Sequence, residues 1–275
     1  MHPGLAGSAR AAIPLHAVDA RNAKSWLARR QADDILTVST NARARIAAAF
    51  GIPESSIDMV GEGPSDIFRP IRDLRAVNSM LDRYRLPAAA PLVLYVGGIS
   101  PHKNLDGLLQ AFARLPERMH LAIAGDHAGD SFYGCYPQLL ELRARLGLES
   151  RVTFTGFVPD EDLALLYNAA TVLALPSFDE GFGLPAVEAM ACGLPVLASR
   201  SGSLPEVVGT AGVFFDPRDP AEMAAALLRV LEDPELRGEL SAEGLRRAAL
   251  FTWSAAARET VRLFERLAGP PAAEG

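Results

Sequence analysis

Cysteine is scarce in this sequence: only Cys135 and Cys192 occur among its 275 residues. Two cysteines this far apart exclude a disulfide framework, and their spacing is not that of metal ligands. The five histidines include no His-x-x-x-His pair. Both cysteines are therefore predicted to be small, buried hydrophobic residues.

Long apolar runs and an excess of positive charge are also missing. No segment approaches the roughly 20 apolar residues of a membrane span, and the first residues lack the charged-then-apolar pattern of a signal peptide. Lysine and arginine number 27 against 33 aspartate and glutamate residues, a net charge of −6. This balance argues against nucleic-acid binding, which depends on clustered positive charge, but allows an anion at one local site. We expect a cytoplasmic protein with no nucleic-acid partner.

What the chain does have is a globular composition and, from Leu92 onward, a regular rhythm. Hydrophobic residues make up 49% and charged residues 22%, which is typical of a protein with a large core. Short apolar runs alternate with helical segments, a pattern that favours right-handed crossovers and a parallel sheet covered on both faces. The sequence therefore predicts an α/β fold with a doubly wound, Rossmann-like sheet. The expected strands are Leu92–Val96, Leu121–Ala124, Val152–Thr155, Val172–Leu175, Pro195–Ala198 and Val213–Phe215, and the expected helices are Leu105–Arg114, Pro137–Leu146, Asp160–Ala169, Pro185–Ala191, Leu204–Val208, Pro220–Leu231, Pro234–Ala249 and Ser254–Leu267.

The residues before Leu92 predict part of a second α/β unit. Strands are expected at Asp34–Ser39 and Ile57–Val60, with a helix between them that Asn41 caps and Gly51 ends. A further helix is expected over residues 22–31. Two strands are too few for the usual sheet of five or six, so we expect the end of a larger domain whose beginning is absent.

A hinge is predicted at the turn-rich segment Gly61–Pro70, and an amphipathic helix at Ile71–Tyr84. The expected division is a partial N-terminal α/β domain and hinge over residues 1–70 and a ligand-binding Rossmann-like domain over residues 71–250. A C-terminal helix over residues 251–275, capped by Ser254, is expected to pack back on the N-terminal part.

The stretch Phe178–Pro195 predicts a binding site. Gly181 and Gly183 permit a tight turn after a buried strand, and Pro185 and Gly193 suit the first turn and the C′ position of a short helix. In an open parallel sheet such a turn lies where ligands bind. The free amides of Phe182, Gly183 and Leu184 and the positive end of the helix suit an anion.

Two carboxylates, Glu180 and Glu188, bracket this anion site. Glu188 lies one turn inside the helix, and helical side chains lean toward the N-terminus, so its carboxylate can reach the crevice near Glu180. An acidic pair suits a phosphorylated ligand that also carries hydroxyl groups. The alternative is that Glu188 is exposed and Glu180 is a solvated turn residue.

Two further loops are candidates at the same sheet edge. The loop from Gly97 and Gly98 to Lys103 places a lysine at a helix start, where it opposes the dipole, and phosphate oxygens are its natural partner; the alternative is a solvated lysine. The loop around Val158, before a helix capped by Asp160, can lie against a base or be an ordinary connection. No Gly-x-Gly-x-x-Gly fingerprint or Walker loop is present, which disfavours a Rossmann oxidoreductase.

These blocks, taken in order, resemble the nucleotide-sugar domain of retaining GT-B glycosyltransferases of family 4, the glycosyl transferases group 1. The resemblance covers about residues 33–267. It is carried by Gly97-Gly98, Lys103-Asn104, Gly125-Asp126, residues 152–158, Glu180-Gly-Phe-Gly-Leu-Pro-Ala-Val-Glu188 and Leu204-Pro-Glu206. A GT-B-like fold is implied, with the first 70 residues as a remnant of the acceptor-side domain.

The resemblance also implies roles. Glu180 would contact hydroxyls of the donor hexose, Glu188 the ribose and Lys103 the diphosphate. The amides of Phe182, Gly183 and Leu184 would meet sugar and phosphate, and the loop near Val158 would meet the base. Many members have an arginine before the lysine; Gly98 and His102 stand at the corresponding positions here, so phosphate binding is weaker or His102 assists.

The implied activity is transfer of a hexose, with GDP-mannose as a candidate donor, to a glycan or lipid-linked acceptor with retention. No metal and no cofactor are required by this arrangement. Two alternatives remain: a nucleotide-sugar-binding module that needs a partner to supply the missing domain, and a GT-B-like nucleotide-sugar epimerase. Peripheral association with the inner face of the membrane is left open.

Overall fold

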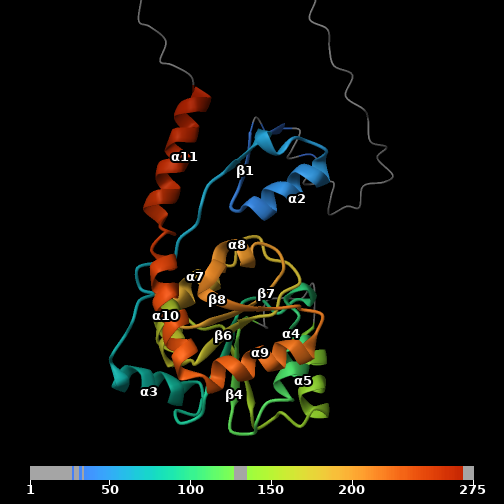
Figure 1. Ribbon diagram of the computed structural model, residues 1–275, viewed down its shortest axis with the longest axis vertical. Coiled ribbons are helices and arrows are strands. Elements are labelled where there is room, and N and C mark those ends of the chain that lie inside the picture. Colours follow the sequence, from blue (N-terminus) through green and yellow to red (C-terminus); the bar gives the residue numbers. More distant parts are fainter. Residues whose placement is uncertain (1–26, 28–30, 33, 127–134, 269–275) are drawn as a thin grey trace, which may run out of the picture.

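The computed structural model describes residues 27, 31–32, 34–126 and 135–268, and Figure 1 shows how its elements are arranged. Most of the helix expected over residues 22–31 lies outside the described residues. None of the described helices is long and apolar enough to cross a bilayer.

Six parallel strands form the main sheet. They are β3 (Leu92–Val96), β4 (His120–Ala124), β5 (Val152–Gly156), β6 (Val172–Leu175), β7 (Val196–Ser199) and β8 (Gly212–Phe215). Their order is β5-β4-β3-β6-β7-β8, so the chain winds outward from β3 in one direction and from β6 in the other. The predicted doubly wound sheet is confirmed. Its switch point lies between β3 and β6, where diverging loops leave a crevice at the carboxyl ends of the strands.

Helices cover both faces of this sheet (Figure 1). One face packs against α4 (Leu105–Phe112), α5 (Tyr136–Arg145) and α9 (Pro220–Glu232), and the other against α3 (Leu74–Arg83), α6 (Asp160–Ala169), α7 (Leu184–Ala191) and α8 (Leu204–Val208). The helix α10 (Pro234–Ala248) contributes to both cores, through Leu240 on the α4 side and Ala248 on the other. Side chains of β3 alternate between the two cores, Val93 and Tyr95 on the α4 side and Leu94 on the α3 side. This is the two-residue period of a strand buried on both faces.

A smaller parallel pair, β1 (Ile35–Thr37) and β2 (Ile57–Met59), is joined by α2 (Thr40–Phe50). The cap of α2 is Ser39, whose extended backbone lets its hydroxyl accept the Ala42 N–H at 3.0 Å. The expectation that Asn41 is the cap is therefore wrong, because Asn41 already lies in the first turn. Gly51 ends α2 in the left-handed conformation, as predicted.

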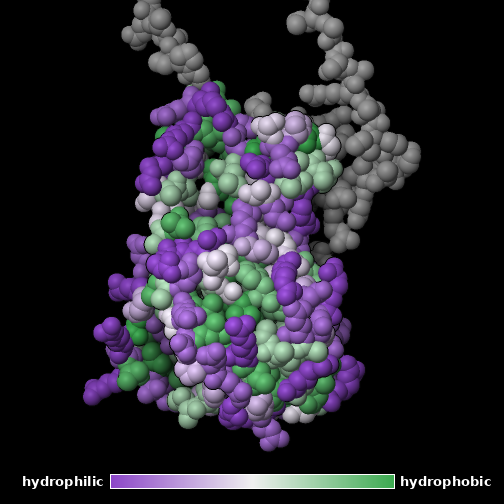
Figure 2. All heavy atoms as spheres, in the orientation of Figure 1, coloured by the Kyte–Doolittle hydropathy of each residue, from purple (hydrophilic) through white to green (hydrophobic). Residues whose placement is uncertain are grey.

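The last helix, α11 (Trp253–Ala268), lies beside this small unit (Figure 1). Arg266 pairs with Asp58 of β2 and, at 3.8 Å, with Asp34. On the face drawn in Figure 2, the surface over α11 is mainly hydrophilic. The predicted cap Ser254 is wrong: the Thr252 hydroxyl accepts the Ala255 N–H at 3.1 Å.

One further predicted cap is wrong. Asp160 is the first residue of α6, and the N-cap position belongs to Pro159, which has no side-chain acceptor. Pro159 has the extended backbone conformation of an N-cap residue. The Asp160 side chain does not cap the helix, and Asp160 lines the cavity at the carboxyl ends of β3, β4 and β5.

Asn104 ties together the loops at the carboxyl edge of the sheet. It is 2% exposed and adopts a left-handed conformation with φ 56°. Its side-chain amide donates to the carbonyl oxygens of Pro176 at 3.0 Å and Pro217 at 2.8 Å. Because these carbonyls follow β6 and β8, Asn104 fixes the loop after β3 against two others.

We predict that Asn104→Ala lowers the free energy of unfolding by about 2–4 kcal/mol, because two inward-facing carbonyls lose their donor and alanine is forced into a left-handed conformation. Chemical denaturation measures this loss. Asn78→Ala on the exposed side of α3 is the control and should change stability by less than about 0.5 kcal/mol. Equal effects of the two substitutions would contradict the structural role of Asn104.

Candidate functional site

The turn between β6 and α7 depends on Gly183. Its φ of 94° lies in the left-handed region, and a Cβ there would stand 2.7 Å from Leu204 Cδ2. Gly193 follows α7 with φ 77°, as the sequence predicts for C′. Gly181 is different, because its φ is not positive and a Cβ would meet nothing within 4 Å. The turn conformation therefore requires glycine at position 183 only, and Gly181 leaves open space above the loop.

Four consecutive amides of this turn lack an acceptor. Within the described part of the chain, the N–H groups of Gly181, Phe182, Gly183 and Leu184 donate no hydrogen bond. Phe182 is only 7% exposed, and buried N–H groups in native proteins almost always have a partner. The positive end of α7 lies at the same place. These donors therefore fit an anionic ligand.

Lys103 and Glu180 meet at the switch point, one from the loop after β3 and the other from the loop after β6. Lys103 ends a short 3₁₀ turn (Pro101–Lys103) rather than starting α4. Its Nζ lies 2.7 Å from Glu180 Oε1, with 19% and 13% of the two side chains exposed. Lys103 is thus not a solvated lysine. An ammonium has three N–H groups, so the pair leaves two for phosphate oxygens.

Ser177 also holds Glu180, since its hydroxyl donates to the same Oε1 at 2.8 Å. Ser177 is fully buried. The two bonds orient the Glu180 carboxylate and use only one of its oxygens, so Oε2 remains for a hydroxyl of a ligand.

Glu188 is half-buried on α7, and the alternative in which it is exposed does not hold. Tyr167 of α6 donates its hydroxyl hydrogen to Glu188 Oε2 at 2.8 Å. Burial raises the pKa of Glu188, and the hydrogen bond from Tyr167 lowers it by a smaller amount. The fold thus keeps a carboxylate in surroundings that disfavour its charge, which is common at functional sites.

Val158 lines a cavity of about 310 Å³ at the carboxyl ends of β3, β4 and β5, together with Gly98 and the exposed ring of Phe157. The lining of this cavity is largely apolar, which suits a base. His102 is exposed, and its Nδ1 lies 3.1 Å from Ser100 Oγ. Its ring therefore bonds Ser100 rather than Lys103 or Glu180.

The sequence did not predict the residues of the loop after β7 that hold the amide turn. Ser203 is fully buried, and its N–H donates to the Glu180 carbonyl at 3.1 Å. No spacing in the sequence signals this contact, which depends on the loops after β6 and β7 lying side by side. Glu206 does not cap its own helix: it accepts the Thr40 and Asn41 N–H groups of α2 at 2.9 and 3.2 Å.

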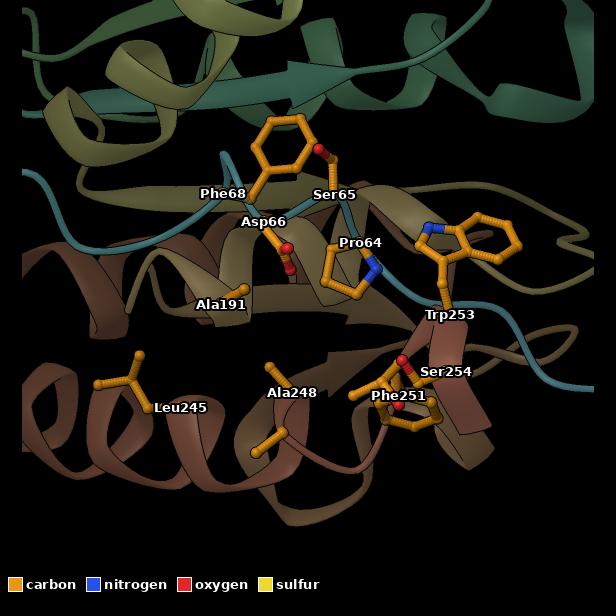
Figure 3. Close-up of a pocket in the computed structure, with 12 residues that line it drawn as sticks. Pro64, Ser65, Asp66, Phe68, Ala191, Leu245, Ala248, Phe251, Trp253 and Ser254 are labelled. Atoms are coloured by element: carbon orange, nitrogen blue, oxygen red, sulfur yellow. The ribbon is translucent and has the colours of Figure 1, made fainter. Parts of the chain in front are cut away.

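A separate cavity of about 710 Å³ lies at the carboxyl end of α7 (Figure 3). The hinge, the end of α7 and the corner between α10 and α11 surround it, through Pro64, Ser65, Asp66, Phe68, Ala191, Leu245, Ala248, Phe251, Trp253 and Ser254. Among the described residues that line it, Asp66 alone is charged. The described residues that line it include no cation, so this cavity does not suit a diphosphate.

Among the described residues, no group of three or more His, Cys, Asp or Glu side chains could hold a metal ion. The Asp-x-Asp run Asp160–Asp162 does not change this. Asp162 is 8% exposed, and its carboxylate is bound by Arg83 at 2.5 Å and Tyr84 at 2.9 Å.

The sequence matches one known protein family over most of the main sheet domain. The model of the family "Glycosyl transferases group 1" matches residues 80–247, a span that includes the switch-point loops and α7. The chain belongs to this family. The predicted resemblance to the glycosyl transferases group 1 is thereby confirmed.

Known members of the glycosyl transferases group 1 are similar over most of this chain. O-antigen chain mannosyltransferase B of Escherichia coli is 38% identical over 237 residues, which cover 85% of this chain and 60% of that protein. Sucrose-phosphate synthase of Thermosynechococcus elongatus superposes with a TM-score of 0.74 at 31% identity, covering 86% of this chain and 58% of that one. Anabaena HepE, solved with UDP and glucose, shows the same fold with a TM-score of 0.77 at 24% identity, over 91% of this chain and 67% of HepE. The chain thus spans 60% of the length of the mannosyltransferase.

We predict that Glu188→Gln stabilises the unliganded fold increasingly as pH rises. Burial raises the Glu188 pKa above its ordinary value of 4.5, so ionisation costs folding stability once pH exceeds that value, whereas glutamine keeps the acceptor for Tyr167 without a charge. Denaturation at a series of pH values should show a small difference near pH 4 that grows toward pH 7.

Glu149→Gln, at an exposed turn position before β5, is the control for loss of a negative charge. A difference for Glu188→Gln that stays flat or shrinks between pH 4 and pH 7 would contradict the buried, desolvated state of this carboxylate.

Proposed function

We propose that the crevice between β3 and β6 binds a nucleoside-diphosphate sugar and that the chain transfers its hexose to a glycan or lipid-linked acceptor with retention. The observation that carries this proposal is the run of four amides at residues 181–184 that have no acceptor in the described part of the chain. The Lys103–Glu180 pair and Glu188 flank this run. Anion donors, a cation and two hydroxyl-accepting carboxylates in one crevice match the phosphates and hydroxyls of such a donor.

Each group of the donor has a proposed counterpart. The amides and Lys103 take the diphosphate, Glu180 takes hydroxyls of the hexose and Glu188 those of the ribose. The base enters the cavity at Val158 and Phe157. The structure of HepE in complex with UDP and glucose supports the donor class.

Mannose is the favoured hexose, and GDP-mannose the favoured donor. The support is the name of the E. coli relative, a mannosyltransferase. A lipid-linked acceptor would bring the chain to the inner face of the membrane.

The proposed chemistry is electrostatic. As the bond from the sugar to the diphosphate breaks, negative charge grows on the leaving oxygens while the sugar becomes oxocarbenium-like. The Lys103 ammonium and the oriented amides stabilise the leaving charge, most strongly when water is excluded. Glu180 holds the sugar by its hydroxyls. These residues supply stabilisation of the leaving group without a metal.

Nucleotide titration and a transfer assay on the same preparation test the proposal. We expect GDP or UDP to bind, and a hexose to reach an acceptor with its anomeric configuration unchanged in the product NMR spectrum. Binding without transfer to any acceptor would replace this proposal with a nucleotide-sugar-binding module that needs a partner chain. Conversion of the donor sugar without acceptor would favour an epimerase, and absence of nucleotide binding would overturn all three.

We predict that Lys103→Ala and Glu188→Ala each weaken GDP or UDP binding by about tenfold or more, because each removes a charged hydrogen-bonding partner worth about 1.5–3 kcal/mol. Calorimetric titration measures the effect. Arg118→Ala is the control. Arg118 is an exposed cation just before β4, at the opposite edge of the sheet, and it pairs with Glu232. Unchanged affinity in both site variants would refute the placement of the donor.

A further inference from the structure

A single residue of the loop after β7 holds two carbonyl groups of the amide turn. The Ser203 N–H donates to the Glu180 carbonyl at 3.1 Å. The Ser203 hydroxyl lies 2.8 Å from the Phe182 carbonyl oxygen and 3.0 Å from that of Glu180. A hydroxyl has only one hydrogen. The shorter distance, and the N–H already given to Glu180, assign this hydrogen to Phe182.

The carbonyl between these two is held from a different part of the chain. Ser39 Oγ, at the cap of α2, donates to the Gly181 carbonyl oxygen at 2.6 Å. Ser39 is 1% exposed and Ser203 fully buried. Three successive carbonyls, from Glu180 to Phe182, therefore point into hydrogen bonds with buried serines.

Holding a carbonyl also fixes the N–H of the next residue. A trans peptide is planar, and its C=O and N–H point in opposite directions; none of the described peptide bonds is cis. The serines therefore orient the N–H groups of Gly181, Phe182 and Gly183 away from themselves. These are amides that find no acceptor in the described chain.

The two loops lie so close that little else fits between them. Gly202, next to Ser203, has φ 61°, and a Cβ there would stand 2.5 Å from Glu180 N and 2.7 Å from its carbonyl oxygen. The close approach of the two backbones therefore places Ser203 beside the turn. The Ser203 hydroxyl adds a hydrogen bond to this contact but does not determine how closely the loops pack.

We propose that Ser203 is a positioning residue that aims the amides of Gly181 and Gly183 at the ligand, and that Ser39 does the same for Phe182. This inference rests on the proposed function, which makes the diphosphate the ligand of these amides. Donors that are oriented in advance need no reorganisation when the anion binds or when charge grows on it.

The test is Ser203→Ala in the full chain, with binding of GDP, UDP, guanosine and uridine followed by NMR titration. Loss of one hydrogen bond corresponds to about a three- to tenfold weaker binding of GDP or UDP. The nucleosides, which lack the phosphates, should change by less than about twofold. A purely structural serine would lower the unfolding temperature and alter nucleotide and nucleoside binding alike.

Ser199→Ala is the matched control. Ser199 is equally buried, and its hydroxyl donates to the Ser177 carbonyl at 2.6 Å instead of to the turn. We expect a comparable loss of stability with GDP affinity within about twofold of the parent. If the parent binds nucleotide and Ser203→Ala binds GDP equally well, this inference fails while the proposed function stands. If the parent binds neither GDP nor UDP, both fail.

Should Ser203→Ala not fold, Ser39→Ala tests the middle carbonyl in the same way. It should weaken GDP or UDP binding by a similar factor and leave the nucleosides unaffected. Equal affinity of Ser39→Ala and the parent for GDP would then overturn the inference.

Discussion

A parallel sheet whose strand order reverses between β3 and β6 imposes one constraint on the whole molecule. The loops that leave these two strands must turn to opposite faces, and nothing in the sheet can fill the space between them. Asn104 fixes the outer walls of that space by joining the loops after β3, β6 and β8. The placement of Lys103 beside Glu180, 77 residues apart in sequence, follows directly from this topology.

Charge within the crevice is arranged at a cost to stability. Lys103 and Glu180 compensate each other with little exposure to water, and removal of either partner would leave the other charge unpaired. Glu188 has no cationic partner among the contacts described, only the Tyr167 hydroxyl and a pKa raised by burial. Such unfavourable placement persists where function requires it, and the core beneath compensates for it.

Much of this arrangement was accessible from the sequence, for physical reasons that differ between elements. The strands β3 and β6 and the helix α6 were predicted with their observed bounds, since apolar runs and flanking turn residues determine them locally. Helix caps were less predictable. Asn41, Asp160 and Ser254 all have suitable side chains, but each lies inside its helix, because the helix begins one or two residues earlier than its sequence suggests.

The amide turn was predicted from its glycines and prolines, whereas its support was not. Gly183 and Pro185 act on their own backbone, so their spacing is informative. Ser39, Ser177 and Ser203 act across the fold, and serines are common in any loop. Their roles emerge only when strand order brings the loops together. The same applies to Lys103, whose carboxylate partner could not be assigned before the switch point was located.

One contact gives the crevice a connection to the small N-terminal unit. The start of α2 contacts the amide turn through Ser39 at Gly181, and it contacts α8 through its amides at Glu206. Any ligand that changes the position of Gly181 must therefore change how firmly α2 is seated. Thermodynamic reciprocity requires the converse to hold with the same free energy. Ligand binding in the crevice and packing of α2 against Gly181 are thus thermodynamically coupled.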